Sequence, residues 1–148
     1  MCQHIIVPVD ASDRSWRATV VADRLAAALD ADVEVLHVEA LPWEPARDRL
    51  LARLARTPWI GAPPTISFVS EARGIARAIA DHVAGVEGSL VLASTGRDRA
   101  DVVLGGVTTE LLAATGRPVV VVGPEADVEG PEWGSELLVT VDLSLIHI

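Results

Sequence analysis

The chain has 148 residues, and its 12 basic and 21 acidic side chains give a formal net charge of −9. All of the basic side chains are arginine, which excludes a phosphate loop ending in Gly-Lys-Ser/Thr and a Schiff-base lysine. The acidic charge argues against nucleic acid as the main partner. The single cysteine excludes a disulfide framework, and no apolar run approaches the roughly 18 residues that span a bilayer. We therefore expect a cytoplasmic protein built around one main domain, without a membrane or nucleic-acid partner.

Short apolar segments alternate with helical patterns along the chain. The first strand is predicted over residues 4–9, and the first helix runs from Asp13 to about Leu29 with Ser12 as its N-cap. Further strands are predicted over residues 33–38, 65–69, 89–92 and 118–122, and further helices over about 46–56, 75–84 and 106–116. This alternation predicts an α/β fold, a doubly wound five-stranded parallel sheet with helices on both faces.

The composition changes after residue 123. Residues 124–134 are acidic and rich in Gly and Pro, so we predict a linker there. Residues 137–142 (LLVTVD) repeat the form of residues 5–10 (IIVPVD), which predicts that residues 135–142 begin a second copy of the domain; the alternative is a chance apolar strand. Residues 143–148 match the translation of a transposon-end sequencing adapter, and we expect them to be foreign to the gene.

Asp10 directly follows the first predicted strand. Ligands of parallel sheets bind beyond the carboxyl ends of the strands, so its carboxylate could accept hydrogen bonds from a ribose or a base, or hold a metal ion. The alternative is a turn or helix-cap residue. Because Ser12 is the better cap, we expect Asp10 to stay free for a ligand.

The loop predicted over residues 93–105 is the second candidate site. Its small residues would let backbone N–H groups approach an anion, and Gly105-Gly106 opens a helix whose N-terminus favours phosphate. Arg97 and Arg99 could add positive charge. A solvated surface loop is the alternative interpretation.

The remaining polar and aromatic residues form weaker patterns. Three of the histidines lack metal-ligand spacing and are predicted to be structural or exposed (His4, His37 and His82). Three of the tryptophans are predicted to pack in the core (Trp16, Trp43 and Trp59), and two glutamates are predicted to lie at an edge or in solvent (Glu34 and Glu39).

Two motifs resemble the universal stress protein family. The first motif is Val-Pro-Val-Asp-x-Ser at residues 7–12. The second begins with a small residue, Ala93, followed after two residues by Gly96 and after a further nine residues by Gly106. ATP-binding members of that family carry Gly-x-x-Gly, nine residues, then Gly-Ser or Gly-Thr. The resemblance covers nearly all of residues 1–123. It implies a Rossmann-like sheet in strand order 3-2-1-4-5 and dimerisation through the fifth strands. The family also has tandem two-domain members, which agrees with the predicted repeat, so we expect the chain to be the N-terminal part of such a member.

The family's nucleotide site carries over with two departures. Ala93 stands where the first glycine belongs, and Val107 stands where the phosphate-binding hydroxyl belongs, with Thr108 one residue late. A lost hydroxyl-to-phosphate hydrogen bond costs about 1–3 kcal/mol. The resemblance implies backbone contacts to adenine near Val38, and it places Asp10 as a metal ligand only together with a nucleotide. The predicted binding residues are Pro8, Val9, Asp10, Val38, Ala93, Gly96, Arg97, Gly106, Val107 and Thr108.

Three functions follow from these expectations. The first is a stress-response module that binds ATP or a related adenine nucleotide, with or without Mg²⁺. It would act through a homodimer, or through pairing with a second copy in the same chain, and through contact with a protein partner. The second is a domain of the same family that binds no nucleotide and acts by protein contact alone. A slow ATPase ranks last, because the sequence offers neither a base poised for water nor a lysine for the γ-phosphate.

Overall fold

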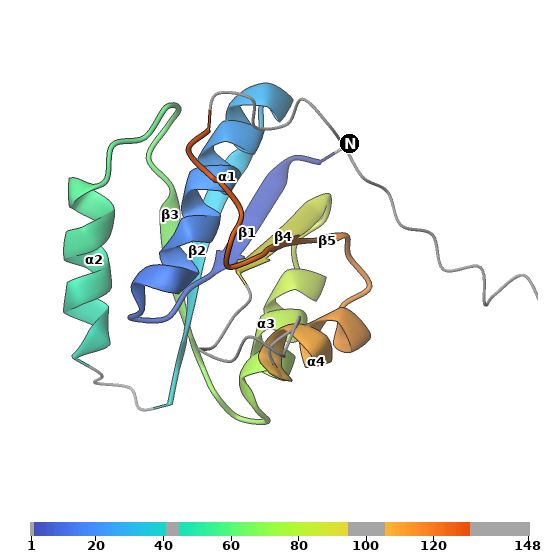
Figure 1. Ribbon diagram of the computed structural model, residues 1–148. Helices are drawn as coiled ribbons and strands as arrows, with labels where there is room; N and C mark the ends of the chain where they lie inside the picture. Colours follow the sequence, from blue (N-terminus) through green and yellow to red (C-terminus); the bar gives the residue numbers. More distant parts are fainter. Residues whose placement is uncertain (1, 41–44, 95–105, 131–148) are drawn as a thin grey trace, which may run out of the picture.

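The computed structural model describes residues 2–40, 45–94 and 106–130 of the chain. All strand pairs in these ranges are parallel, and the sheet has the order β3-β2-β1-β4-β5 (Figure 1). This confirms the predicted doubly wound α/β fold. The elements are β1 (His4–Pro8), α1 (Asp13–Leu29), β2 (Asp32–Glu39), α2 (Ala46–Arg56), β3 (Thr65–Ser70), α3 (Ile75–Ala84), β4 (Ser89–Ser94), α4 (Gly106–Ala114) and β5 (Val119–Val122).

β1 lies at the centre of the sheet, and its apolar run is covered on both faces. Ile5, Ile6 and Val7 are fully buried. Ile5 lies opposite Val33 of β2 on one side and Leu90 of β4 on the other. A continuous run of branched apolar residues is what a parallel strand with two covered faces requires.

Two hydrophobic cores lie on opposite faces of the sheet. Trp16 of α1 and Leu50 of α2 belong to one core, together with Val35 of β2. Ile79 of α3 and Leu111 of α4 belong to the other. Each helix pair therefore buries its apolar stripe against one face of the sheet, as expected for a doubly wound fold.

Residues 123–130, which we call the strap, lie along α1 after the end of β5 (Figure 1). Arg17 and Arg24 of α1 donate hydrogen bonds to backbone carbonyls at the two ends of the strap. Between them Val128 is only 7% exposed and packs into the core beneath α1. The acceptors are the carbonyls of Gly123, Pro124 and Ala126 for Arg17, and those of Glu129 and Gly130 for Arg24.

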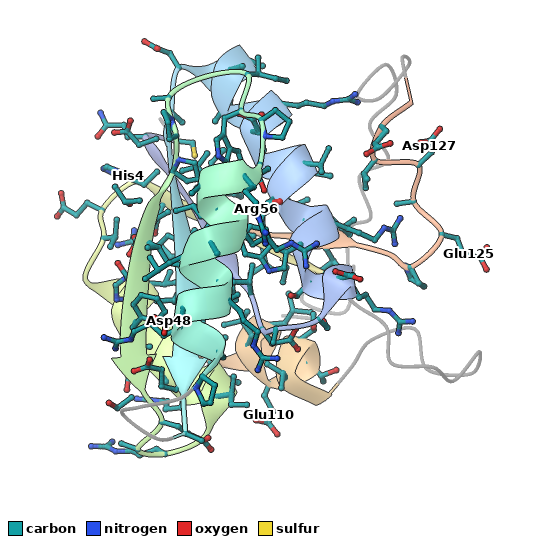
Figure 2. The ribbon with its side chains drawn as sticks, turned by 90° about the vertical axis from the view of Figure 1, so that its left-hand side faces the viewer. His4, Asp48, Arg56, Glu110, Glu125 and Asp127 are labelled. Carbon is teal, nitrogen blue, oxygen red and sulfur yellow. The ribbon has the colours of Figure 1, made fainter. Side chains whose placement is uncertain are left out.

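The described part of the predicted linker is therefore packed against the domain. The acidic side chain of Glu125 points outward from the strap (Figure 2), whereas Oδ1 of Asp127 accepts a hydrogen bond from the Glu129 amide within the strap at 3.2 Å. Residues 131–148, which hold the rest of the predicted linker, the predicted repeat strand (135–142) and the predicted adapter sequence (143–148), lie outside the described residues.

β4 is longer than the sequence pattern predicts. It continues to Ser94, and Ala93 lies opposite Val121 of β5. Ala93 was expected to open the loop, and that expectation was wrong, because the small residues here still pair with β5. As a strand residue Ala93 needs no glycine-like backbone, so its methyl group is compatible with this conformation.

Candidate functional site

The predicted residues Pro8, Val9, Asp10 and Val38 come together at the carboxyl edge of the sheet. β1 and β2 are neighbours, with Pro8 opposite Leu36, so the residues that follow each strand meet at the same edge. The register of β1 with β4 continues toward the same edge, where β4 ends at Ser94. This edge is where ligands bind in open parallel sheets.

Asp10 is exposed, but its carboxylate is already engaged by the start of α1. Oδ1 accepts a hydrogen bond from the Ser12 amide at 2.8 Å and another from the Ser12 hydroxyl. Ser12 is also the N-cap of α1, as predicted, since its hydroxyl oxygen accepts a hydrogen bond from the Ser15 amide. The expectation that capping by Ser12 would leave Asp10 free was therefore wrong for one oxygen of this carboxylate, because the same serine does both.

These contacts keep Asp10 ionised. Partial burial raises the pKa of the Asp10 carboxyl, but the hydrogen bonds from the hydroxyl and amide of Ser12 outweigh it, with smaller contributions from Ser15 and from the charge of His37. The net pKa lies below its ordinary value. An ionised carboxylate with one engaged oxygen can accept a hydrogen bond from a ligand hydroxyl through the other.

Val38 directs its backbone polar groups toward the end of β1. On the β1 side, the Leu36 carbonyl accepts a hydrogen bond from the amide of Val9, the residue after β1, at 2.9 Å. On the β3 side, the Glu39 carbonyl accepts a hydrogen bond from the Glu71 amide at 2.8 Å. Backbone groups of successive strand residues point alternately to the two neighbouring strands. The N–H and C=O of Val38 therefore face the side of β1, beside Asp10.

The phosphate side of the predicted site is only partly described. Gly106 is the first residue of α4, and a Cβ added there would meet no atom within 4 Å. Val107 is 37% exposed, whereas Thr108 is only 6% exposed and lies on the packed side of α4 with Leu111. The side chain of Thr108 is thus buried against the domain and does not lie on the exposed side of α4. Gly96, Arg97 and Arg99 lie outside the described residues.

A polar cluster beside this edge joins the buried Glu39 to the exposed Arg47, and the sequence pattern did not predict it. Glu39 was expected at an edge or in solvent, but it is only 4% exposed, and that expectation was wrong. Its two carboxylate oxygens accept hydrogen bonds from Nε and Nη2 of Arg47, both at 2.9 Å. The guanidinium of Arg47 also lies 4.3 Å from the ring centroid of Phe68, whose ring meets that of His37 edge to face. The pair joins β2 to α2, and no local spacing in the sequence could reveal it.

We expect this pair to make stability depend on pH in the acid range. The hydrogen bonds from Arg47 lower the pKa of Glu39 below its ordinary value of 4.5, against a smaller effect of burial. A carboxylate with a lowered pKa contributes stability above its unfolded-state pKa, and this contribution is lost as the pH falls through its folded-state pKa. The difference in unfolding free energy between the wild type and Arg47→Gln should therefore be largest at neutral pH and shrink below about pH 4.5.

Urea unfolding at a series of pH values measures this difference. Arg49→Gln is the matched control, because Arg49 lies exposed on the same helix with no partner among the described residues. A difference for Arg47→Gln that stays constant from neutral to acid pH would contradict the assignment.

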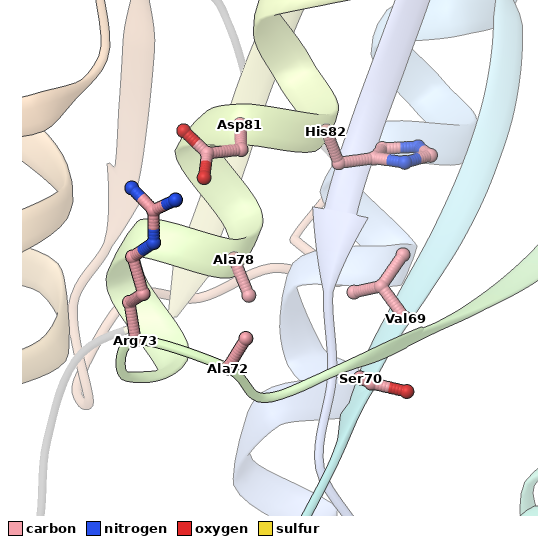
Figure 3. A pocket seen from close by; sticks show the side chains of 7 residues that line it. All are labelled: Val69, Ser70, Ala72, Arg73, Ala78, Asp81 and His82. Carbon is pink, nitrogen blue, oxygen red and sulfur yellow. The ribbon is translucent and has the colours of Figure 1, made fainter.

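Two surface hollows lie away from Asp10 and Val38. One, of about 320 Å³, lies between the end of β3 and α3. Figure 3 shows Arg73 and Asp81 pointing toward one another across it, while His82 points toward β2, where its Nε2 lies 2.8 Å from Oε1 of Glu34. The other, of about 660 Å³, is lined by residues from the starts of β1 and β2 and the end of α1. Neither hollow contains a predicted binding residue.

Within residues 2–40, 45–94 and 106–130, no three His, Cys, Asp or Glu side chains are grouped closely enough to hold a metal ion. Asp10, the one predicted metal ligand, therefore belongs to no such group among the described residues. The same ranges contain no helix that is both long and apolar enough to cross a bilayer.

Known proteins show where this fold belongs. The sequence profile of the universal stress protein family matches residues 1–123, and no curated protein resembles the chain closely enough to count as a match. A universal stress protein structure from Archaeoglobus fulgidus is 18% identical, with a TM-score of 0.65 over 82% of this chain and 98% of its own. A universal stress protein in complex with cAMP is 19% identical (TM-score 0.58, covering 81% and 96%). The Archaeoglobus fulgidus protein in complex with dAMP is also 19% identical (TM-score 0.56, covering 82% and 97%). Since the profile spans most of the residues, the chain belongs to the universal stress protein family.

Proposed function

We propose that this protein binds an adenine nucleotide at the carboxyl edge of its sheet and acts as a stress-response regulatory module. The observation that carries the proposal is that Asp10 and the backbone groups of Val38, which face the end of β1, lie together at one edge of the sheet. The similar structures solved with cAMP and dAMP support an adenine ligand.

The chemistry of the two residues suits the two parts of a nucleoside. Adenine presents a ring-nitrogen acceptor beside an amino donor, which complements the N–H and C=O of Val38. The ionised carboxylate of Asp10 can accept hydrogen bonds from ribose hydroxyls. The backbone amides at the N-terminus of α4, which begins at Gly106, would then donate hydrogen bonds to the phosphates.

Titration calorimetry of the full chain tests the proposal. We expect binding of AMP, ADP or ATP, measured with and without Mg²⁺, and much weaker binding of guanosine nucleotides. Asp10→Ala should weaken the binding of ribonucleotides by about tenfold or more, because it removes a charged acceptor. Absence of heat at about millimolar adenine nucleotide would sink the proposal. The most specific form of the proposal is that the ligand is ATP with Mg²⁺ held near Asp10. Comparing the affinities of the three nucleotides with and without Mg²⁺ tests that form.

Val107→Ser should tighten ATP binding by about tenfold. The substitution restores a hydroxyl at the start of α4, where one hydrogen bond to phosphate contributes about 1–3 kcal/mol. Calorimetry against wild type measures the change. Leu112→Ser is the matched control, since Leu112 is comparably exposed on the same helix (42% against 37%). Equal affinities in both variants would show that α4 does not meet the phosphates.

The second candidate is a domain that binds no nucleotide and works through protein contact alone. The exposed Val107 and the inward-facing Thr108 favour it, because neither supplies a phosphate-binding hydroxyl. Native mass spectrometry separates the candidates: co-purified nucleotide supports the first, and an empty protein that dimerises supports the second. If the protein has any enzymatic activity, we expect it to be slow ATP hydrolysis by the first candidate, the nucleotide-binding module.

We further propose that two copies of the domain pair through β5, in a homodimer or within one longer chain. β5 is the edge strand of the sheet, and Val120 on it is 36% exposed. An exposed apolar edge strand is a ready template for a second strand. Sedimentation of the wild type and of Val120→Lys tests this pairing. The cytoplasmic location and the absence of membrane and nucleic-acid partners stay predictions.

A further inference from the structure

The peptide group between Val9 and Asp10 is held by two side chains. The Val9 carbonyl lies 2.9 Å from Nδ1 of His37 in β2. The Asp10 amide donates to the hydroxyl of Ser15 in α1 at 3.1 Å. Because a carbonyl can only accept, Nδ1 of His37 must carry the hydrogen and donate it. His37 is only 5% exposed, so this hydrogen bond is shielded from water.

The hydrogen bond from His37 takes the place of a rung of the sheet. The Val9 amide donates to Leu36, so the regular parallel ladder would continue with the Val38 amide donating to the Val9 carbonyl. That rung does not occur among the hydrogen bonds of the described residues, and the pairing of β1 with β2 ends at Pro8. The imidazole therefore satisfies the carbonyl that the Val38 amide would otherwise occupy.

We propose that His37 is a positioning residue of the nucleotide site, which ends the β1–β2 ladder one rung early and so leaves the Val38 amide available to the adenine base. This inference rests on the proposed function, and it adds the side chain that creates the gap in the ladder. The same hydrogen bond holds the peptide that leads into Asp10, so His37 sets both the base-binding and the ribose-binding groups. In this role His37 acts through the backbone of Val9 and Val38.

The surroundings of His37 hold the ring in this orientation. The ring of Phe68 on β3 meets it edge to face, with centroids 6.1 Å apart. The charged groups facing His37 are the carboxylates of Asp10 and Glu39, which a positive charge on the ring would attract. Glu39 is also paired with Arg47. Nδ1 donates in the protonated ring and in the neutral tautomer with hydrogen on Nδ1, so the bond to Val9 does not require a charged histidine.

Three variants of the full chain test the role of the donor. His37→Asn places its amide nitrogen where Nδ1 lies and keeps a donor for the Val9 carbonyl. His37→Leu has nearly the same shape as Asn but no donor. His37→Gln keeps a polar amide but carries it one bond further out, away from the Val9 carbonyl. It replaces His37→Leu as the variant without a donor at that carbonyl if the Leu variant does not fold. His82→Leu is the control, because His82 contacts Glu34 away from the site.

The first readout is hydrogen exchange of the Val38 amide, which needs no ligand. We expect rapid exchange in the wild type and in His37→Asn, and exchange slowed by about tenfold or more in His37→Leu or His37→Gln, where the ladder can close. The second readout is AMP affinity, which should stay within about threefold in His37→Asn and fall by about tenfold or more in the other two.

The outcomes separate the inference from the function on which it rests. A wild type that binds no adenine nucleotide contradicts both. AMP binding that survives unchanged in the donor-deficient variants, or a Val38 amide that is equally protected in all proteins, overturns the role of His37 alone. A loss in His37→Asn as large as in His37→Leu would also overturn it, since shape rather than the donor would then matter.

Discussion

Trp16→Ala should lower the free energy of unfolding by about 3–5 kcal/mol, measured by urea denaturation. Trp16 is 3% exposed in the core beneath α1, and the guanidinium of Arg53 lies 4.8 Å from its ring centroid. Truncation to Ala removes the buried ring, leaves a cavity that close-packed neighbours fill only partly, and ends the contact with Arg53. A large loss is expected because α1 anchors the core on this face of the sheet.

Trp16→Phe should cost clearly less than Trp16→Ala. The Nε1 of Trp16 is buried without a hydrogen-bond partner among the described residues, so Phe removes a polar group that is costly to bury while keeping most of the ring. Trp59→Phe is the matched control, because its Nε1 donates to the Leu54 carbonyl at 3.3 Å and Phe would lose that hydrogen bond. If Trp16→Phe proved as damaging as Trp16→Ala, the indole N–H would have a partner that stabilises it.

Replacing Arg17 and Arg24 together by Gln should release the strap. Hydrogen bonds from charged donors contribute about 1.5–3 kcal/mol each when solvent is partly excluded. Both side chains are half-buried, and they lie seven residues apart on one face of α1. Since their acceptors are backbone carbonyls, the substitution removes the anchoring without changing the strap itself. Val128 would then lose its place in the core.

Limited proteolysis with a Glu-specific protease measures the release. Cleavage after Glu125 and Glu129 should be faster by about tenfold or more in the double variant, because a protease needs the backbone free of such contacts. Cleavage after Glu110 in α4 is the internal reference, and Arg49→Gln is the control for losing an arginine. Unchanged cleavage within the strap would mean that Val128, rather than the two arginines, holds it.

The order of elements and the class of fold could be predicted from the sequence. Ile5, Ile6 and Val7 form an apolar run whose continuity specifies a strand covered on both faces, and the helical spacing between strands specifies the crossovers. These signals are local and periodic, so they survive without knowledge of the partners. The strand order came from the resemblance to the family, since periodicity does not say which strands are neighbours.

The candidate site could be predicted only in outline. Asp10 was expected at the carboxyl edge because it follows a strand, and Val38 was expected there from the resemblance to the family. Both residues lie at that edge, and their role in binding stays a prediction. What each side chain does was not predictable in the same way. One serine both caps α1 and engages Asp10, and a helix turn places Thr108 toward the core.

The sequence by itself determined a doubly wound parallel sheet with a possible ligand edge, because apolar periodicity and strand-end residues encode these locally. Only the tertiary structure decided which polar groups are buried and what they contact. Arg47 meets Glu39, His37 meets the carbonyl of Val9, and Arg17 meets the strap across spans of 8 to more than 100 residues. The physical reason is that a buried polar group must find a partner wherever the crossovers bring one, and no spacing along the chain records where that will be.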